Sequence, residues 1–367
     1  MAKDNGEKKS ARRTVRADRL LGELGVRHTR KAVSTGRDRR GNSQEEKILS
    51  LWRKGSLSRA EILSYVKAVT DEGSASYIPP KNRIVVTDLD GTLFCETDPI
   101  YFDFRLLAHR VLEDLDYRDL ASETERSVAE KILDYAETGK LAPGLEVDAG
   151  KAIASAFAGM TVTEFNEYVS RFGELPAPGY EGMKAGDAFY QPMLQLLDYL
   201  EEKGFSVYIC SGTDRMVIRE IVSEIDIAPN QVIGTDRQFL AREQGCMRDT
   251  EYCFESDDEL VLGGELLNKN LQMSKVELIA REIGMQPVLC LGNSSGDTSM
   301  ARYVSAKNPY PTRVFMLCCD DTERESGDLE KAAKMRLMCE ENGWVPVSMR
   351  DDWETIYGPG VKKKEKA

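Results

Sequence analysis

The chain has 367 residues, is 41% hydrophobic and 31% charged, and carries a net charge of −12. It is long enough for one large domain with an insertion or for two domains, while its apolar runs are too short to cross a bilayer. Its basic start lacks the apolar stretch of a secretory signal, so we expect a cytoplasmic protein.

The chain begins with a basic segment. Through Arg40 it has 13 Lys and Arg against 5 Asp and Glu, a charge of +8, which leaves −20 for the remainder. We interpret residues 1–43 as a flexible, solvated arm, because no aromatic residue lies among the charges; binding to nucleic acid or to an acidic surface is the alternative. The acidity of the remainder argues against nucleic acid as the main substrate.

A helical extension is predicted at residues 44–80. Its apolar residues recur at helical spacing in two groups, the first around Ile48 and the second from Ile62 to Val69, so we expect two helices. A Pro-Pro pair at 79–80 ends this pattern. The sequence IVVTDLD at 84–90 then predicts the first strand of a parallel sheet that is buried on both faces.

Residues 98–179 have the patterns of helices alone. Ser122 with Glu125, and Thr161 with Glu164, have the spacing of capping boxes ahead of apolar periodicity. The Pro- and Gly-rich residues 175–186 are typical of a linker. We therefore predict a helical cap domain at 98–179, inserted into a larger domain.

Strand and helix patterns alternate after the linker, with a predicted β-hairpin in the polar stretch beyond residue 234. This alternation is typical of βαβ units and a parallel sheet. We predict an α/β fold with a Rossmann-like parallel sheet core at 81–97 and 180–350, followed by a C-terminal tail at 351–367. Ligands of such sheets bind beyond the carboxyl ends of the strands.

Asp88 and Asp90 lie at that end of the first predicted strand. Residues two apart in an extended chain point to the same side, so both carboxylates can face one point. Mg²⁺ would remove their repulsion, and one aspartate could then attack phosphorus while the other handles a proton. Gly91 permits a sharp turn, and Thr92 offers a hydroxyl near the site. The alternative is an ordinary Asx turn at a strand end.

Two further sites follow other predicted elements. Ser211, Gly212 and Thr213 come just before a helix that is predicted to begin near Asp214, where they could cradle an anion or only cap the helix. A Ser-x-x-Glu pattern from Ser274 places Lys275 in the first turn of another predicted helix. A cation is disfavoured there by the helix dipole, so Lys275 is either a partner of a bound phosphoryl group or a surface lysine.

The fourth site is the loop GNSSGD after the strand pattern PVLC. Asp297 could complete a Mg²⁺ shell with Asn293 as a neutral ligand, or the loop could be a simple turn. Because all four sites lie at the carboxyl ends of separate predicted strands, we predict that they form one site for Mg²⁺ and a phosphoryl group. With only two histidines, His28 and His109, a zinc site or a histidine-based triad is not expected. The eight cysteines, which lack a C-x-x-C pair, are predicted to be mostly buried thiols.

The motifs DLDGT, SGT, Lys275 and GNSSGD resemble, in order and spacing, the four motifs of the haloacid dehalogenase-like (HAD) superfamily of phosphohydrolases. The helical insertion between the first and second motifs resembles the phosphoserine-phosphatase-like branch. This resemblance covers about residues 83–320 and is most specific in the first motif.

The resemblance implies a role for each matched residue. Asp88 would be the nucleophile that becomes an aspartyl-phosphate, and Asp90 the general acid and base. Ser211 and the N–H of Gly212 would bind a phosphoryl oxygen, and Lys275 would hold Asp88 and the phosphate together. Asp88, the backbone carbonyl of Asp90 and an acid of the fourth motif would bind Mg²⁺.

The fourth motif departs from many relatives. They carry an aspartate where Asn293 stands, which predicts weaker metal binding here and leaves open whether Asn293 or Asp297 is the ligand. Glu96, where the chain enters the cap, could meet an ammonium group of the substrate, and Arg105 or Arg110 of the cap could meet a carboxylate; ordinary salt-bridged or solvated roles are the alternatives.

These observations predict a Mg²⁺-dependent phosphatase acting on a small phosphorylated metabolite. One alternative is a phosphotransferase that uses the same intermediate. The other is a regulatory protein that binds metal and phosphate but has lost turnover through Asn293. The sequence does not indicate an oligomeric state.

Overall fold

The computed structural model describes residues 48–365. The predicted arm at 1–43 lies outside these residues. Of the two helices expected in the extension, the second is present as α2 (Leu57–Thr70), capped by the Ser56 hydroxyl, which accepts a hydrogen bond from the Arg59 N–H. The first is not present in the residues that the structure describes, because residues 48–51 form turns and Trp52 forms an isolated bridge with Trp353.

Seven strands form the central sheet in the order β5-β4-β3-β1-β6-β7-β8. They are β1 (Ile84–Thr87), β3 (Ser206–Asp214), β4 (Val232–Ala241), β5 (Leu260–Asn268), β6 (Leu289–Gly292), β7 (Arg313–Cys318) and β8 (Val345–Ser348). All neighbours are parallel except β4 and β5, which form the predicted hairpin. The predicted α/β core is confirmed, and β1 lies at its centre.

The sheet buries both faces, because successive side chains of its strands enter two different apolar clusters. Val85 of β1 packs in one cluster and Val86 in the other. The same alternation relates Leu289 to Cys290 in β6. A strand that is buried on both faces needs a continuous apolar sequence, and the apolar residues 84–86 therefore allowed β1 to be predicted.

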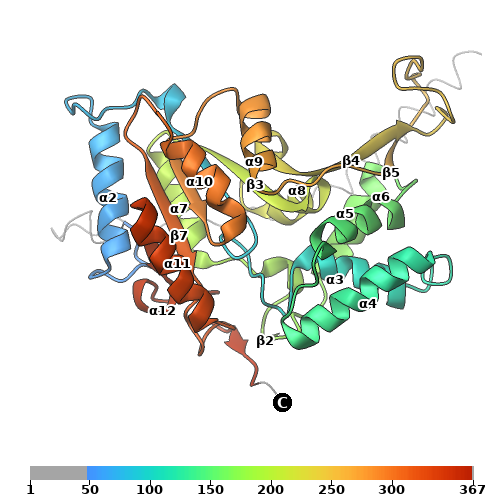
Figure 1. Cartoon of the computed structure of the whole chain (residues 1–367), viewed down its shortest axis with the longest axis horizontal. Helices are drawn as coiled ribbons and strands as arrows, with labels where there is room; N and C mark the ends of the chain where they lie inside the picture. Colours follow the sequence, from blue (N-terminus) through green and yellow to red (C-terminus); the bar gives the residue numbers. More distant parts are fainter. Residues whose placement is uncertain (1–47, 366–367) are drawn as a thin grey trace, which may run out of the picture. The chain divides into compact units, whose positions relative to one another are not determined.

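Helices flank this sheet on both faces (Figure 1). They are α7 (Gln191–Glu202), α8 (Arg215–Ile221), α9 (Met273–Leu278), α10 (Thr298–Ser305), α11 (Leu329–Asn342) and α12 (Met349–Asp352). A π-helical segment, Ile279–Ile283, continues α9. None of the helices within residues 48–365 combines the length and apolar character that a bilayer crossing requires.

The predicted cap consists of four helices that lie together in Figure 1, where they are coloured green. They are α3 (Phe102–Ala108), α4 (Glu123–Thr138), α5 (Leu145–Ala156) and α6 (Val162–Gly173), with a π-helical segment, His109–Glu113, after α3. Both predicted capping boxes are present. Ser122 and Glu125 begin α4, and Thr161 and Glu164 begin α6.

The cap is hydrogen-bonded to the β4–β5 hairpin through its own backbone. The Gly159 N–H donates to the Leu262 carbonyl and the Leu262 N–H donates to the Met160 carbonyl, each over 2.8 Å. Phe165 of α6 packs over the buried guanidinium of Arg237, with 4.7 Å from Cζ to the ring centroid. These contacts fix the side of the cap that lies away from its connections to the core.

The C-terminal residues contact the return linker of the cap. Strand β9 (Lys362–Lys363) pairs with β2 (Tyr180–Glu181) in an antiparallel two-stranded sheet. Glu325 is fully buried beneath this pair and accepts hydrogen bonds from the hydroxyls of Thr97, Tyr180 and Tyr357. We call these four residues the Glu325 cluster. Glu325 itself lies in the connection between β7 and α11, and its three partners come from the entry linker, the return linker and the tail. The predicted tail is therefore part of the packed structure.

Candidate active site

A cavity of about 620 Å³ lies where the cap meets the carboxyl ends of β1, β3 and β6. Its lining contains every predicted site residue except Thr92: Asp88, Asp90, Glu96, Ser211, Gly212, Lys275, Asn293 and Asp297. Residues up to 209 positions apart in the sequence therefore meet in one place, because parallel strands bring their carboxyl ends to one edge of the sheet.

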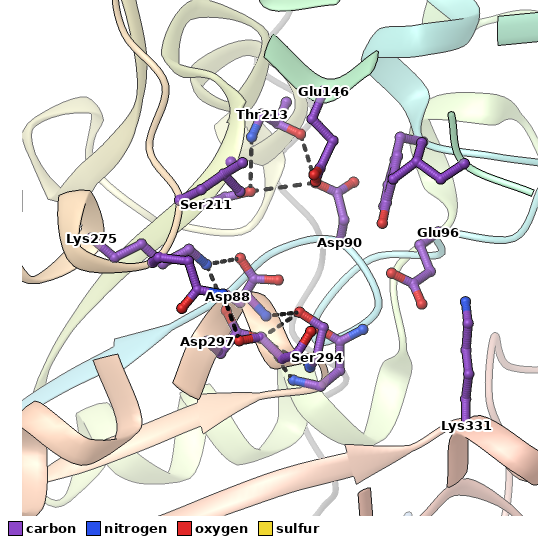
Figure 2. Close-up of a pocket in the computed structure, with 18 of the residues that line it drawn as sticks. Asp88, Asp90, Glu96, Glu146, Ser211, Thr213, Lys275, Ser294, Asp297 and Lys331 are labelled. Atoms are coloured by element: carbon purple, nitrogen blue, oxygen red, sulfur yellow. Dashed lines mark hydrogen bonds and ion pairs between the residues drawn. The ribbon is translucent and has the colours of Figure 1, made fainter. Parts of the chain in front are cut away.

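Lys275 is held between two carboxylates at the inner end of this cavity (Figure 2). Its Nζ donates to Oδ1 of Asp88 over 2.7 Å and to Oδ1 of Asp297 over 2.6 Å. All three side chains are buried. Burial and the Asp297 carboxylate raise the pKa of Asp88, and the lysine opposes that rise. The same carboxylates raise the pKa of Lys275 against the effect of its burial, so we take the lysine to be charged.

The helix of Lys275 does not begin with the predicted capping box. Helix α9 begins at Met273, and Gln272 precedes it without a capping side chain. The Ser274 hydroxyl donates instead to Oδ1 of Asn268 over 2.8 Å. Lys275 does lie in the first turn, and its two carboxylate partners supply the reason why a cation is stable there.

Asp90 accepts hydrogen bonds from two hydroxyls of β3 (Figure 2). Oδ2 of Asp90 lies 2.6 Å from Oγ1 of Thr213 and 3.3 Å from Oγ of Ser211. Burial and the nearby charge of Asp103 raise the pKa of Asp90 to about 7, although the Thr213 hydroxyl opposes the rise. A carboxyl group with such a pKa can give and take a proton near neutral pH.

Ser211 does not cap the following helix. Strand β3 continues through Ser211 to Asp214, and Asp214 caps α8 by accepting from the N–H groups of Met216 and Val217. Since the aspartate serves as the cap, the Ser211 hydroxyl remains inside the cavity beside Asp90. The helix begins where the sequence predicted it.

Gly91 allows the first and fourth motifs to approach closely. Its φ is +74°, and a Cβ at this position would lie 1.9 Å from Nδ2 of Asn293 and 2.7 Å from the Glu96 carboxylate. Any larger residue would therefore push Asn293 and Glu96 out of the cavity wall. Thr92 has no exposed surface and does not line the cavity; its hydroxyl lies 3.3 Å from Oδ1 of Asn293.

Asp297 already has donors for both of its carboxylate oxygens. Oδ1 accepts from Lys275, and Oδ2 accepts from the N–H groups of Asn293 and Ser294, each over 3.1 Å. Oδ1 of Asn293 has only the long contact with Thr92, and no described residue donates a hydrogen bond to Oδ2 of Asp88. These two oxygens fit a hard cation better than those of Asp297.

Across residues 48–365, no three His, Cys, Asp or Glu side chains converge as metal ligands. A Mg²⁺ site in this cavity would therefore be mixed, with the Asp88 carboxylate, the Asn293 amide oxygen and the Asp90 backbone carbonyl as the donors that the residues offer. Such a set suits Mg²⁺, which is bound through few carboxylates and retains several waters.

The two cap arginines are not in the cavity lining. Arg105 pairs with Asp98 over 3.5 Å, and Arg110 pairs with Asp114 over 2.6 Å. Both arginines therefore have the salt-bridged role that was the alternative to binding a substrate carboxylate. Glu96 does line the cavity, and burial raises its pKa to about 7.

Several lining residues were missed by the sequence reasoning. The cap supplies Tyr101, Asp103, Tyr135 and Glu146, and the core supplies Lys269, Leu271, Lys331, Lys334, Met335 and Met338. No motif marks them, because they reach the cavity through the packing of whole helices. The sequence held one weak indication, because the four lining residues from Lys331 to Met338 recur at the spacing of one face of a helix.

A family model for haloacid dehalogenase-like hydrolases matches residues 85–302. The chain belongs to this family. The match covers the four motifs and the cap insertion, and it confirms the family that DLDGT and the other motifs indicated. No functionally curated protein shows significant sequence similarity to the chain.

Several solved structures show partial similarity to the chain. A Bordetella pertussis Tohama I protein of unknown function is 14% identical and has a TM-score of 0.46. The match covers 72% of this chain and 98% of that chain. Cytosolic 5'-nucleotidase IIIB bound to cytidine is 12% identical, with a TM-score of 0.45 and coverage of 84% and 92%. A substrate-bound phosphoserine phosphatase is 13% identical, with a TM-score of 0.35 and coverage of 65% and 86%.

Proposed function

We propose that this HAD-like hydrolase is a Mg²⁺-dependent phosphatase that cleaves a small phosphomonoester through an aspartyl-phosphate on Asp88. The supporting observation is the 2.7 Å contact between Asp88 and the buried Lys275, in the same cavity as Asp90 and Ser211. A nucleophilic carboxylate, a fixed cation and a carboxyl group able to transfer a proton are the parts that phosphoryl transfer requires.

Asp88 attacks the phosphorus atom with one of its carboxylate oxygens. As the new P–O bond forms, the bond to the leaving oxygen breaks, and Asp90 donates its proton to that oxygen. Asp90 then takes a proton from water, whose oxygen attacks the phosphorus. Inorganic phosphate leaves and the Asp88 carboxylate is restored.

The other residues position these groups. Lys275 fixes Asp88 and offers its charge to the phosphoryl oxygens, and Ser211 offers a hydroxyl beside Asp90. Mg²⁺ would be held by Asp88, the backbone carbonyl of Asp90 and Oδ1 of Asn293, and it would neutralise phosphate charge there. Asp297 keeps Lys275 and the fourth motif in place and is not proposed as a direct ligand.

The first test is Asp88→Asn, compared with the wild type on a panel of phosphomonoesters. We expect phosphate release to fall by about 10³-fold or more, because the amide is not a nucleophile. Asp257→Asn, on the exposed β4–β5 connection, is the matched control and should retain wild-type release. Substantial release by Asp88→Asn would reject the assignment of the nucleophile.

Two further measurements separate the alternatives. Chelation of Mg²⁺ is expected to abolish release, and its return to restore it. An added alcohol acceptor shows whether transfer product exceeds free phosphate, in which case the protein is a phosphotransferase. Metal binding without release from any member of the panel would identify a regulatory protein.

A further inference from the structure

Helix α11 forms one wall of the cavity with a single face. Lys331, Lys334, Met335 and Met338 line the cavity, and their spacing of three, four and seven residues places them along one side of the helix. This helix lies beyond residues 85–302, which match the family model. The wall is therefore an addition to the matched region and not one of its motifs.

The lysines lie at the outer end of the cavity. Lys331 and Lys334 are exposed, as are Gly139 and Leu141 of the cap, whereas Asp88 and Lys275 at the inner end are buried. Figure 2 shows the Lys331 side chain extending from the helix toward Glu96, on the side of the cavity away from Lys275. A ligand whose phosphoryl group reaches Asp88 would thus have its other end near the lysines.

The four cavity lysines differ in their partners. Lys275 is held by two carboxylates, and Lys269 donates to the Gly212 carbonyl over 2.7 Å. Among the described residues, neither Lys331 nor Lys334 has a carboxylate within 4.0 Å. Lys331 extends toward Glu96 and opposes the rise in the pKa of that carboxyl group, whereas Lys334 has no ion pair among the described residues.

The opposite wall would repel an anion. It carries the carboxylates of Glu96, Asp103 and Glu146, beside the rings of Tyr101 and Tyr135. An anionic group at the outer end of a substrate is therefore favoured at α11 and disfavoured at the cap. The cavity volume of about 620 Å³ leaves room for atoms between that group and the phosphoryl group.

We propose that Lys331 and Lys334 form a second anion-binding subsite, and that the preferred substrates are phosphomonoesters with a second anionic group, a carboxylate or another phosphate, away from the reacting phosphorus. Met335 and Met338 supply the apolar surface next to it, against which the connecting carbon atoms can pack. This proposal rests on the proposed phosphatase function, because that function places the reacting phosphoryl group at Asp88.

The test compares matched pairs of phosphomonoesters that share a skeleton and differ only in the second anionic group. One pair contrasts ethyl phosphate with 2-phosphoglycolate, and the other contrasts a sugar monophosphate with its bisphosphate. The wild type is expected to have a higher kcat/KM for the member with the second anion. In Lys331→Gln/Lys334→Gln, we expect the ratio of the two kcat/KM values within a pair to fall about fivefold or more, because two exposed charge contacts with the second anion are lost.

The matched control is Lys67→Gln/Lys81→Gln, which removes the same charge from exposed positions outside the cavity and should keep the wild-type ratio. The substrate pair whose kcat/KM ratio falls further in the α11 double variant shows whether the subsite prefers a carboxylate or a phosphate. An unchanged ratio in the α11 double variant, or an equal fall in the control, would overturn the subsite.

Binding gives a second readout that needs no turnover. Calorimetric Kd values for the same pairs are measured with Mg²⁺ in the Asp88→Asn background, with and without the two lysine substitutions. Absence of phosphate release from every wild-type assay would reject the phosphatase function. The calorimetric ratio would still decide the subsite, since it reports the contact with the second anion directly.

Discussion

Lys275 gains its place in the site from two residues far apart in the sequence. Asp88 directly follows β1 and Asp297 follows β6, and each accepts a hydrogen bond from the ammonium group. Removing one member of such a buried group leaves a charge without its partner, which typically costs about 3–5 kcal/mol. Asp297 is therefore as important to the position of Lys275 as Asp88 is.

Asn293 is the residue where the metal proposal can be tested most directly. Asn293→Asp is expected to tighten Mg²⁺ binding several-fold, because it adds a carboxylate beside Asp88 without changing the size of the side chain. Isothermal titration with Mg²⁺ measures the change, and Asn230→Asp on an exposed turn is the control. An unchanged Kd in Asn293→Asp would mean that this side chain is not a ligand and would return Asp297 to consideration.

The sequence predicted the positions of individual side chains correctly where those positions depend on the local backbone alone. Asp88 and Asp90 follow a buried strand and the N–H of Asp88 donates to the Leu291 carbonyl, as pairing with a neighbouring strand requires. The predicted capping box at Ser274 is wrong, because the Ser274 hydroxyl donates a hydrogen bond to Asn268 instead of capping the helix. Local spacing does not reveal such a competing partner.

At the scale of elements, the C-terminal strand β9 and the Glu325 cluster tie together both linkers of the cap. Glu325 has no exposed surface and is surrounded by hydroxyl donors from Thr97, Tyr180 and Tyr357. A buried carboxylate is stable only while such donors remain. The position of the cap thus depends on residues of the tail.

Tyr357→Phe tests this dependence. The substitution removes a donor to a buried carboxylate, so we expect the free energy of unfolding to fall by about 1–3 kcal/mol. Chemical denaturation measures it, with Tyr310→Phe as the control, since no described residue is hydrogen-bonded to the Tyr310 hydroxyl. Equal stability of Tyr357→Phe and the wild type would show that the cluster does not depend on this hydroxyl.

At the scale of the whole molecule, several acids are gathered in one buried place. Burial raises the pKa values of Asp90 and Glu96 to about 7 and that of Asp103 to about 6. The folded protein therefore retains protons that the unfolded chain loses between about pH 4 and pH 7. Stability of the metal-free protein is expected to fall as the pH rises through that window and to level off above it.

Asp90→Asn should reduce this pH dependence, because the amide does not ionise. For one group the slope changes by at most about 1.4 kcal/mol per pH unit. Denaturation in the presence of a chelator, from pH 4.5 to 8, measures it for Asp90→Asn against the exposed control Asp257→Asn. If both variants keep the wild-type slope, folding does not raise the pKa of Asp90.

The sequence by itself determined the central sheet, the helical insertion and the motif residues at the strand ends. These depend on apolar periodicity, on capping and on the alternation of strand and helix patterns along the chain, which can be recognised in short stretches of sequence. Only the tertiary structure decided that Asp297 holds Lys275, that the cap pairs with β5, and that α11 brings Lys331 and Lys334 to the cavity. Each of these depends on which faces of distant elements meet, and that is set by the packing of the whole chain.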